Sequence, residues 1–222
     1  MLQRVICLLL GYFAGSLVQA GFWIGKFNHI DIREHGSGNA GTTNTMRTLG
    51  KKAGFLTYFL DMFKAVLVAI IIHFVYGNNT GIAEMILILY GGFGVVLGHN
   101  FPFYLKFKGG KGIAATSGVV ISLFLFPKYC FLFTLLGIST FALVVIISKY
   151  VSLGSLVGIA GFFIEFVIWG QIGFLPIPQD QLIESYVVVF LFAALGFIRH
   201  SGNISRLIKG TERKIGEKKN NG

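Results

Sequence analysis

Charged residues are scarce in this sequence. Only 13% of its 222 residues are Asp, Glu, Lys or Arg, whereas 54% are hydrophobic and the mean hydropathy is +0.73. A soluble domain of this length needs far more polar surface to cover its core. The composition therefore excludes an ordinary soluble protein and predicts a single all-α integral membrane domain over residues 1–222.

Cysteine is almost absent, and acidic tails, low-complexity segments and repeats of fixed period are not found. Cys7 and Cys130 both lie in apolar runs, so we interpret them as packing residues rather than as a disulfide or a catalytic pair. No G-x-x-x-x-G-K-[ST] motif occurs, so the sequence does not support nucleotide binding. We expect neither a metal nor a cofactor.

Acidic residues number only nine against 19 basic ones, and the net charge is +10. In a soluble protein this excess would suggest a nucleic acid partner. In a membrane protein its causes are the cytoplasmic charge bias and an anionic ligand. We therefore expect no nucleic acid partner.

Long apolar runs supply the candidate membrane spans, each of which needs roughly 20 residues. The clear candidates are Val5–Gly25, Ala53–Tyr76, Ile82–Leu105, Ser152–Gly170 and Ser185–Ile198. Ile113–Ser148 is too long for one span and short for two, with Pro127-Lys128 as its only break. The first run stays apolar through Gly25, which favours an uncleaved span over a signal peptide.

The basic residues decide between the two span counts. Five lie in Lys26–Lys52, three in Lys106–Gly112 and seven from Arg199 onward, whereas the connections 77–81 and 171–184 carry none. If Ile113–Ser148 makes two passes, the basic residues of these three segments and Lys149 all lie on the same side of the membrane. That side then carries 16 of the 19 basic residues. The positive-inside rule therefore predicts seven transmembrane helices, an N-terminus outside and a basic cytoplasmic tail over residues 199–222.

The first cationic segment, HGSGNAGTTNTMRTLGKK, runs from His35 to Lys52. Its glycines let main-chain N–H groups approach a ligand, its small polar side chains donate hydrogen bonds, and Arg47 can form a fork to a phosphate. A helix that starts nearby would aim its N-terminus at the same anion. The alternative is a flexible loop with ordinary cytoplasmic charge.

Two further cationic segments have similar chemistry. In GHNFPFYLKFKGGKGIAA (Gly98–Ala115), glycines surround Lys111 directly before an apolar helix and predict a second phosphate cradle. We interpret His99 as a hydrogen-bonded histidine at a helix end, with a ligand or base as the alternative. In Ile198–Lys214, the three-residue spacing of His200 and Asn203 places them on one helix face, although a polybasic tail that contacts anionic lipids is the other interpretation.

Asp61 and Lys64 lie inside an apolar span, where one charge costs roughly 2.5–3.5 kcal/mol on insertion scales. Their i,i+3 spacing lets them pair, so we interpret them as a structural charge pair rather than as substrate contacts.

An anion site at the cytoplasmic surface fits two classes of protein. One is an enzyme that acts on phosphorylated lipid precursors, and the other is a transporter of phosphorylated metabolites. A transporter would show paired halves with broken helices near the midplane. Here the polar groups crowd the ends of the spans, which favours the enzyme.

Three motifs in this order resemble those of the bacterial acyl-phosphate-dependent glycerol-3-phosphate acyltransferases, the PlsY family, over nearly the full chain. They are GSGNAGTTNTMRTLGKKAG with DMFK, then GHNFPFYLKFKGGKG, then RHSGNISRLIKGTERK. The departures are Ala40 where proline is common, Ala65 where glycine is usual, and IAAT in place of a V-A-T pattern. None of them removes a reactive group.

The resemblance implies acyl transfer from a fatty acyl phosphate to the sn-1 hydroxyl of glycerol 3-phosphate, which gives lysophosphatidic acid and phosphate in the first step of bacterial phospholipid synthesis. It also implies a multi-pass, seven-span protein of the bacterial plasma membrane that contacts membrane lipids, with an acyl-phosphate-producing enzyme as a candidate partner. The H-x-x-x-x-D pair of the soluble-type acyltransferases is missing at His29, His35, His73, His99 and His200.

Because an acyl phosphate is already activated, no covalent acyl-enzyme is needed. The protein must neutralise two phosphates and hold the hydroxyl near the acyl carbon. By motif match, His200 and Asn203 are the expected catalytic residues, and the proton acceptor is either His200 or the substrate's own phosphate. Glu212 is expected to brace the tail. The expected phosphate-binding residues are Ser37, Asn39, Thr43, Asn44, Arg47, Gly109, Gly110, Lys111 and Gly112.

Overall fold

The structure, a computed structural model, describes residues 1–77, 81–125 and 130–215. Within these ranges every regular element is helical, which confirms the all-α prediction. The α-helices are α1 (Leu2–Leu17), α2 (Ala20–Phe27), α3 (Thr42–Leu49), α4 (Lys51–Tyr76), α5 (Glu84–Asn100), α6 (Ile113–Ser122), α7 (Cys130–Ser148), α8 (Val151–Gln171), α9 (Leu182–Arg199) and α10 (Ser201–Ile208). Short 3-10 turns cover Ile32–Glu34, Phe103–Leu105, Leu123–Leu125 and Gln179–Gln181.

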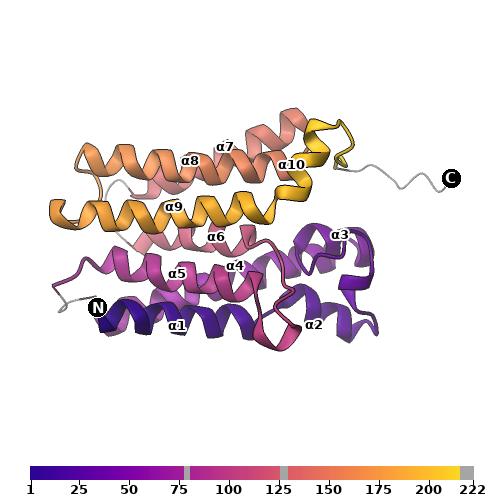
Figure 1. Ribbon diagram of the computed structural model, residues 1–222, viewed down its shortest axis with the longest axis horizontal. Coiled ribbons are helices and arrows are strands. Elements are labelled where there is room, and N and C mark those ends of the chain that lie inside the picture. The colour runs from indigo at the N-terminus through magenta and orange to yellow at the C-terminus, as the bar shows by residue number, and fades with distance from the viewer. Residues whose placement is uncertain (78–80, 126–129, 216–222) are drawn as a thin grey trace.

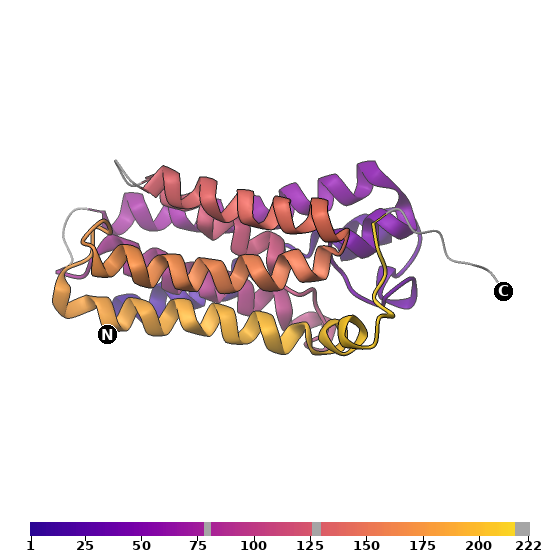
Figure 2. The ribbon, with the colours of Figure 1, turned by 90° about the horizontal axis from the view of Figure 1, so that it is seen from above.

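The long helices lie nearly side by side along one axis (Figure 1). Helices α1, α4 and α5 form one part of the bundle, α7, α8 and α9 form the other, and α6 lies between them (Figures 1 and 2). The short helices α2, α3 and α10 gather at the end opposite the N-terminus. We call this the basic end, because all three cationic segments of the sequence meet there.

Six segments are long and apolar enough to cross a membrane. They are Leu2–Phe27, Lys51–Tyr76, Glu84–Leu105, Phe131–Ser148, Val151–Gln171 and Gln179–Arg199. Many of their large apolar side chains face outward, as contact with lipid requires. The segment Ile113–Ser148 forms two helices, but α6 has ten residues, a length of about 15 Å. A seventh complete crossing therefore stays a prediction.

The first span, expected over Val5–Gly25, is helical but interrupted at Val18 and Gln19. The Gln19 amide donates to the carbonyl of Gly15 at 2.9 Å and to two carbonyls at the end of α5. Lys64 donates to the carbonyls of Gly15 and Val18. These bonds satisfy carbonyls that the interruption leaves without helical partners.

Helices α1 and α5 pack with their backbones in direct contact. A Cβ atom added at Gly11 or Gly15 would lie 1.9 or 2.1 Å from a backbone oxygen of α5, and one at Gly94 or Gly98 would lie 2.1 Å from a backbone oxygen of α1. Small residues at this spacing allow such close packing in membranes. This glycine seam, formed by Gly11, Gly15, Gly94 and Gly98, fixes where the ends of α1 and α5 meet.

An ion pair joins the first and the last span at the end of the bundle that lies far from the basic end. The guanidinium of Arg4 on α1 forms a two-pronged ion pair with Glu184 on α9, with Nη2 2.6 Å from Oε2.

Cys7 is a fully buried free thiol in the core, as its predicted packing role requires. The side chain of Cys130 and the tail beyond Ile215 lie outside the described residues.

Candidate active site

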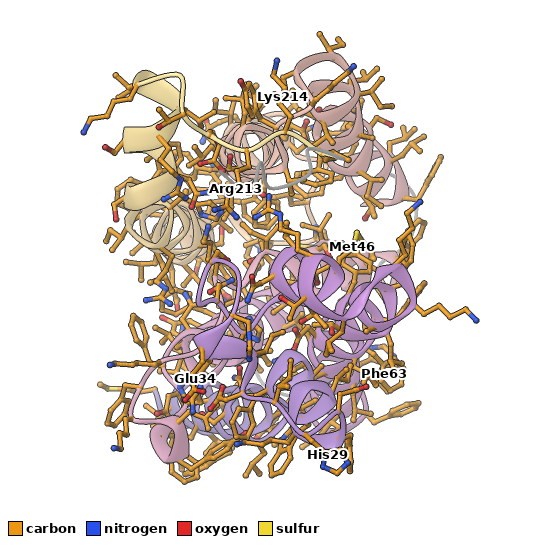
Figure 3. All side chains as sticks on the ribbon, turned by 90° about the vertical axis from the view of Figure 1, so that its right-hand side faces the viewer. His29, Glu34, Met46, Phe63, Arg213 and Lys214 are labelled. Atoms are coloured by element: carbon orange, nitrogen blue, oxygen red, sulfur yellow. The ribbon has the colours of Figure 1, made fainter. Side chains whose placement is uncertain are left out.

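A cavity of about 1080 Å³ opens at the basic end, between the two parts of the bundle. Figure 3 faces this end and labels Arg213 on the C-terminal segment and Met46 on α3. All three cationic segments of the sequence contribute to the wall. The polar side chains that line it are Asp31, Arg33, Glu34, Ser37, Asn39, Thr42, Thr43, Asn44, Arg47, Tyr58, Asp61, His99, Tyr104, Lys106, Lys108, Lys111, Ser152, Ser155, Arg199, His200, Asn203, Arg206, Glu212 and Arg213.

Asn44, in the first turn of α3, organises the first glycine loop, which contains Gly36, Gly38 and Gly41. Its Oδ1 accepts from the backbone N–H of Ser37 at 2.8 Å, and its Nδ2 donates to the carbonyls of Ile32 and His35 at 3.0 and 2.9 Å. The amide is buried, and a Cβ at Gly36, where φ is +62°, would lie 2.2 Å from Oδ1. Asn44 therefore uses its hydrogen bonds to hold Ser37 at the cavity wall.

Two helices begin at the cavity wall, α3 at Thr42 and α6 at Ile113. The first-turn N–H groups of a helix have no helical acceptor and carry partial positive charge. Gly41, Thr42, Gly112 and Ile113 all line the cavity. Both N-termini therefore offer donors to an anion placed there.

Basic side chains outnumber carboxylates on the wall. Arg33 is paired with Asp31, and Arg206 with Glu212, each at 2.7 Å. Arg47 is exposed in the cavity and forms no ion pair with any residue that the structure describes. Partial desolvation by the cavity walls, and then repulsion from neighbouring arginines, lower the pKa of Arg47, yet a guanidinium stays charged at neutral pH. Arg47 is thus available to bind an anion.

Lys111, Asn203 and Glu212 form a hydrogen-bonded chain across the cavity. Lys111 donates to Oδ1 of Asn203, whose Nδ2 donates to Oε1 of Glu212 at 2.7 Å. Ser152 and Arg206 also donate to Glu212, so the expected bracing contact of the tail is present. Burial raises the pKa of Glu212, but hydrogen bonds from Asn203, Arg206 and Ser152 outweigh it and lower that pKa. Burial lowers the pKa of Lys111 to about 8.

His200 is buried, and its Nδ1 lies 2.8 Å from the carbonyl oxygen of Gly196. A carbonyl oxygen only accepts, so Nδ1 carries the proton and Nε2 has a lone pair. Burial, and then the positive charge of Lys111, lower the pKa of His200 to about 4. The imidazole is therefore neutral at physiological pH, and its Nε2 can accept a proton.

The second glycine loop, Gly109–Gly112, is held from two sides. The N–H groups of Gly109 and Gly110 donate to the carbonyls at the end of α5 at 3.1 Å, and Arg199 donates to the carbonyls of both glycines at 3.2 and 2.9 Å. Among the described residues, the backbone N–H groups of Lys111 and Gly112 are the ones left for an anion. The phosphate cradle expected over Gly109–Gly112 stays a prediction, with the N–H groups of Lys111 and Gly112 as its available donors.

The charge pair of Asp61 and Lys64 is present, with Oδ1 2.9 Å from Nζ and both side chains buried. His99, near the end of α5, joins the pair, because its Nδ1 lies 2.8 Å from the same Nζ. This is the hydrogen-bonded helix-end histidine that the sequence indicated. Asp61 and His99 line the cavity.

Most residues of the predicted site meet at this cavity. Those that line it are Ser37, Asn39, Thr43, Asn44, Arg47, Gly109, Lys111, Gly112, His200 and Asn203, whereas the predicted Gly110 packs against His99 and is not part of the lining. The prediction omits Arg199, Ser152, Ser155, Tyr58 and Phe141, which also line it. Ser152 and Ser155 could have been predicted, because they lie at the start of a span shortly after the basic Lys149. Tyr58 and Phe141 carried none, because aromatic residues in a span usually face lipid or core.

Comparison with known proteins gives consistent matches. A sequence model of the family described as glycerol-3-phosphate acyltransferase matches residues 5–210. Glycerol-3-phosphate acyltransferase of Thermoanaerobacter sp. (strain X514) is 35% identical over 221 residues, 98% of each chain. That of Streptococcus pyogenes serotype M5 (strain Manfredo) is 38% identical over 215 residues, 96% of this chain and 94% of its own.

Solved structures give the same result. The glycerol 3-phosphate form of PlsY (YgiH), an integral membrane glycerol 3-phosphate acyltransferase, superposes with a TM-score of 0.78 at 31% identity over 96% of both chains. Its lysophosphatidic acid form superposes with a TM-score of 0.77 at 30% identity, over 96% of this chain and 95% of that one. The similarity thus covers almost the whole length of both chains.

Proposed function

Because the chain belongs to the PlsY-type glycerol-3-phosphate acyltransferase family, as its motifs indicated, we propose that it moves a fatty acyl group from acyl phosphate to the sn-1 hydroxyl of glycerol 3-phosphate. The products are lysophosphatidic acid and phosphate. One observation carries the proposal: Arg47, Lys111, the N-termini of α3 and α6, and the neutral His200 share one cavity wall.

Binding in this proposal rests on charge and on N–H donors. Arg47 and Lys111, together with the N-termini of α3 and α6, neutralise the phosphates of the two substrates. Asn44 acts indirectly, by holding the loop that presents Ser37. Apolar lining residues such as Phe141 and Ala114 place the acyl chain between helices, within reach of the bilayer.

The chemical step is a direct substitution. The hydroxyl oxygen of glycerol 3-phosphate attacks the acyl carbonyl carbon, the bond from that carbon to the phosphate oxygen breaks, and phosphate leaves with the electron pair. The hydroxyl proton goes to Nε2 of His200 or to a phosphate oxygen of the substrate. No thiol is required, and Cys7 does not line the cavity.

Orientation follows from charge. We assign the basic end to the cytoplasm and the Arg4–Glu184 end to the outside of a bacterial plasma membrane. In this orientation a soluble enzyme that makes acyl phosphate could deliver its product at the cavity.

Purified protein in lipid nanodiscs tests the proposal directly. With palmitoyl phosphate and glycerol 3-phosphate it should form lysophosphatidic acid, detected by mass spectrometry, and palmitoyl-CoA should not replace the acyl phosphate. A transporter would instead move glycerol 3-phosphate into vesicles without product. Absence of lysophosphatidic acid in the purified system would make the enzyme assignment wrong.

A further inference from the structure

The cluster beneath the second glycine loop determines which nitrogen of His99 carries a proton. The Lys64 ammonium lies 2.9 Å from Asp61 Oδ1, 2.6 Å from the carbonyl oxygen of Val18 and 3.3 Å from that of Gly15. It also lies 2.8 Å from Nδ1 of His99. Carbonyl and carboxylate oxygens only accept, so Lys64 is the donor throughout, as an ammonium with no lone pair must be.

His99 Nδ1 must therefore accept from Lys64. A neutral imidazole whose Nδ1 accepts carries its proton on Nε2. The competing arrangement, in which Nδ1 donates to Asp61 Oδ1, has the longer distance of 3.4 Å and leaves two donors facing each other at 2.8 Å. The tautomer is opposite to that of His200, in which Nδ1 is the donor.

The Nε2 of His99 lies directly beneath the second glycine loop. A Cβ added at Gly110 would be 2.1 Å from it, and His99 itself lines the cavity although its side chain is only 3% exposed. Nδ1 has its partners, whereas Nε2 has no hydrogen-bond partner within the part of the chain that the structure describes. An N–H that has no protein partner, on a largely buried side chain at the wall of an anion cavity, can donate to a bound ligand.

We propose that His99 binds substrate: its Nε2–H donates to an oxygen of the phosphate held by the second glycine loop, while Lys64 and Asp61 fix the tautomer. The proposal rests on the proposed function, since it takes the bound anion to be a phosphate group. It adds a neutral donor to a site otherwise built from cations and backbone N–H groups, and it gives the intramembrane charge pair a role in binding.

Two substitutions separate this role from simple packing. In His99→Gln, the side-chain Nε2 reaches about as far as the imidazole Nε2, and Lys64 keeps three oxygen acceptors for its three protons. In His99→Asn, the amide can still accept from Lys64 but is too short to reach the cavity. Calorimetric titration with inorganic phosphate and with glycerol 3-phosphate should show affinity about tenfold weaker for His99→Asn and near wild-type for His99→Gln. Equal affinities in the two variants would overturn the proposal.

The wild-type protein supplies a test that needs no substitution. Nitrogen-15 NMR of protein labelled in histidine should show His99 protonated at Nε2 and His200 protonated at Nδ1, and added inorganic phosphate should shift the Nε2–H signal of His99. A His99 proton on Nδ1, or a signal that phosphate leaves unchanged, would refute the inference. Phosphate binding without acyl transfer would overturn the proposed function and leave His99 as an anion ligand.

Discussion

Arg47 combines exposure in the cavity with the lack of a described ionic partner, and the shape of its side chain is the property to test. Arg47→Lys keeps the charge but loses the planar fork that grips a phosphate with two hydrogen bonds. We expect kcat/KM for acyl transfer to fall about tenfold or more, as loss of one charged hydrogen bond predicts. Lys52→Ala, at an exposed position outside the cavity, should stay near wild-type. Full activity of Arg47→Lys would mean that the loop acts by charge alone.

Lys111 should make substrate binding depend on pH. Its pKa of about 8 means that the ammonium is present below pH 8 and is lost as the pH rises through that value. The second pKa of a phosphate monoester is near 6, so the substrate charge is constant from pH 7 upward. KM for glycerol 3-phosphate should therefore rise above pH 8 in the wild type but not in Lys111→Arg, whose guanidinium stays charged. A rise of the same size in both proteins would show that another group titrates.

His200 tests where the hydroxyl proton goes. Its pKa of about 4 keeps Nε2 unprotonated over the whole range in which the enzyme is assayed, so loss of the imidazole should appear in kcat at every pH from 6 to 8. General-base catalysis is worth about 10²–10⁴-fold, and His200→Ala should lose that much if Nε2 takes the proton. A much smaller loss, accompanied by a raised KM, would assign His200 to positioning and leave the substrate phosphate as the base.

The second glycine loop is the element in which side-chain size matters most. A methyl group at Gly110 would meet the imidazole of His99 at 2.1 Å, and the loop would have to move away from α5. Gly110→Ala should therefore raise KM for a phosphate substrate by about tenfold. The displaced loop should also lower the thermal unfolding midpoint, but the protein should stay folded. Gly161→Ala on α8 is the matched control, because the nearest described atom that its new methyl meets outside α8 belongs to Thr140, at 3.9 Å. An unchanged KM in Gly110→Ala would reduce the loop to a connector.

Most of the spans and loops could be predicted from signals that are local in the sequence. Apolar runs located the spans, and glycine with Arg47 or Lys111 marked both loops, because composition over ten to twenty residues determines these features. The interruption at Val18 and Gln19 has no such signal, since Lys64, 46 residues away, satisfies the carbonyl of Val18. Arg199 likewise reaches the site only through tertiary packing against the second loop.

For the whole molecule, charge predicts which end faces the cytoplasm. In a protein with Cys7 and Cys130 replaced by alanine, Ser201→Cys should react with a membrane-impermeant maleimide only after the cells are opened. Gln179→Cys, at the other end of the bundle, should react in intact cells. Labelling of position 201 in intact cells would show that the orientation is the opposite of the predicted one. The cavity would then face away from a soluble donor enzyme in the cytoplasm.

The glycine seam also joins two helices that are synthesised at different times. During synthesis α1 is complete long before α5, whose residues 84–100 follow its last residue, Leu17, by more than sixty positions. At about 5–20 residues per second, the face of α1 that bears Gly11 and Gly15 waits roughly 4–15 s for its partner. Two glycines four residues apart are also the spacing by which membrane helices dimerise. A nascent chain that stalls before α5 is therefore prone to join a second copy of itself, and a fragment of residues 1–77 should cross-link in membranes unless Gly11 is replaced by leucine.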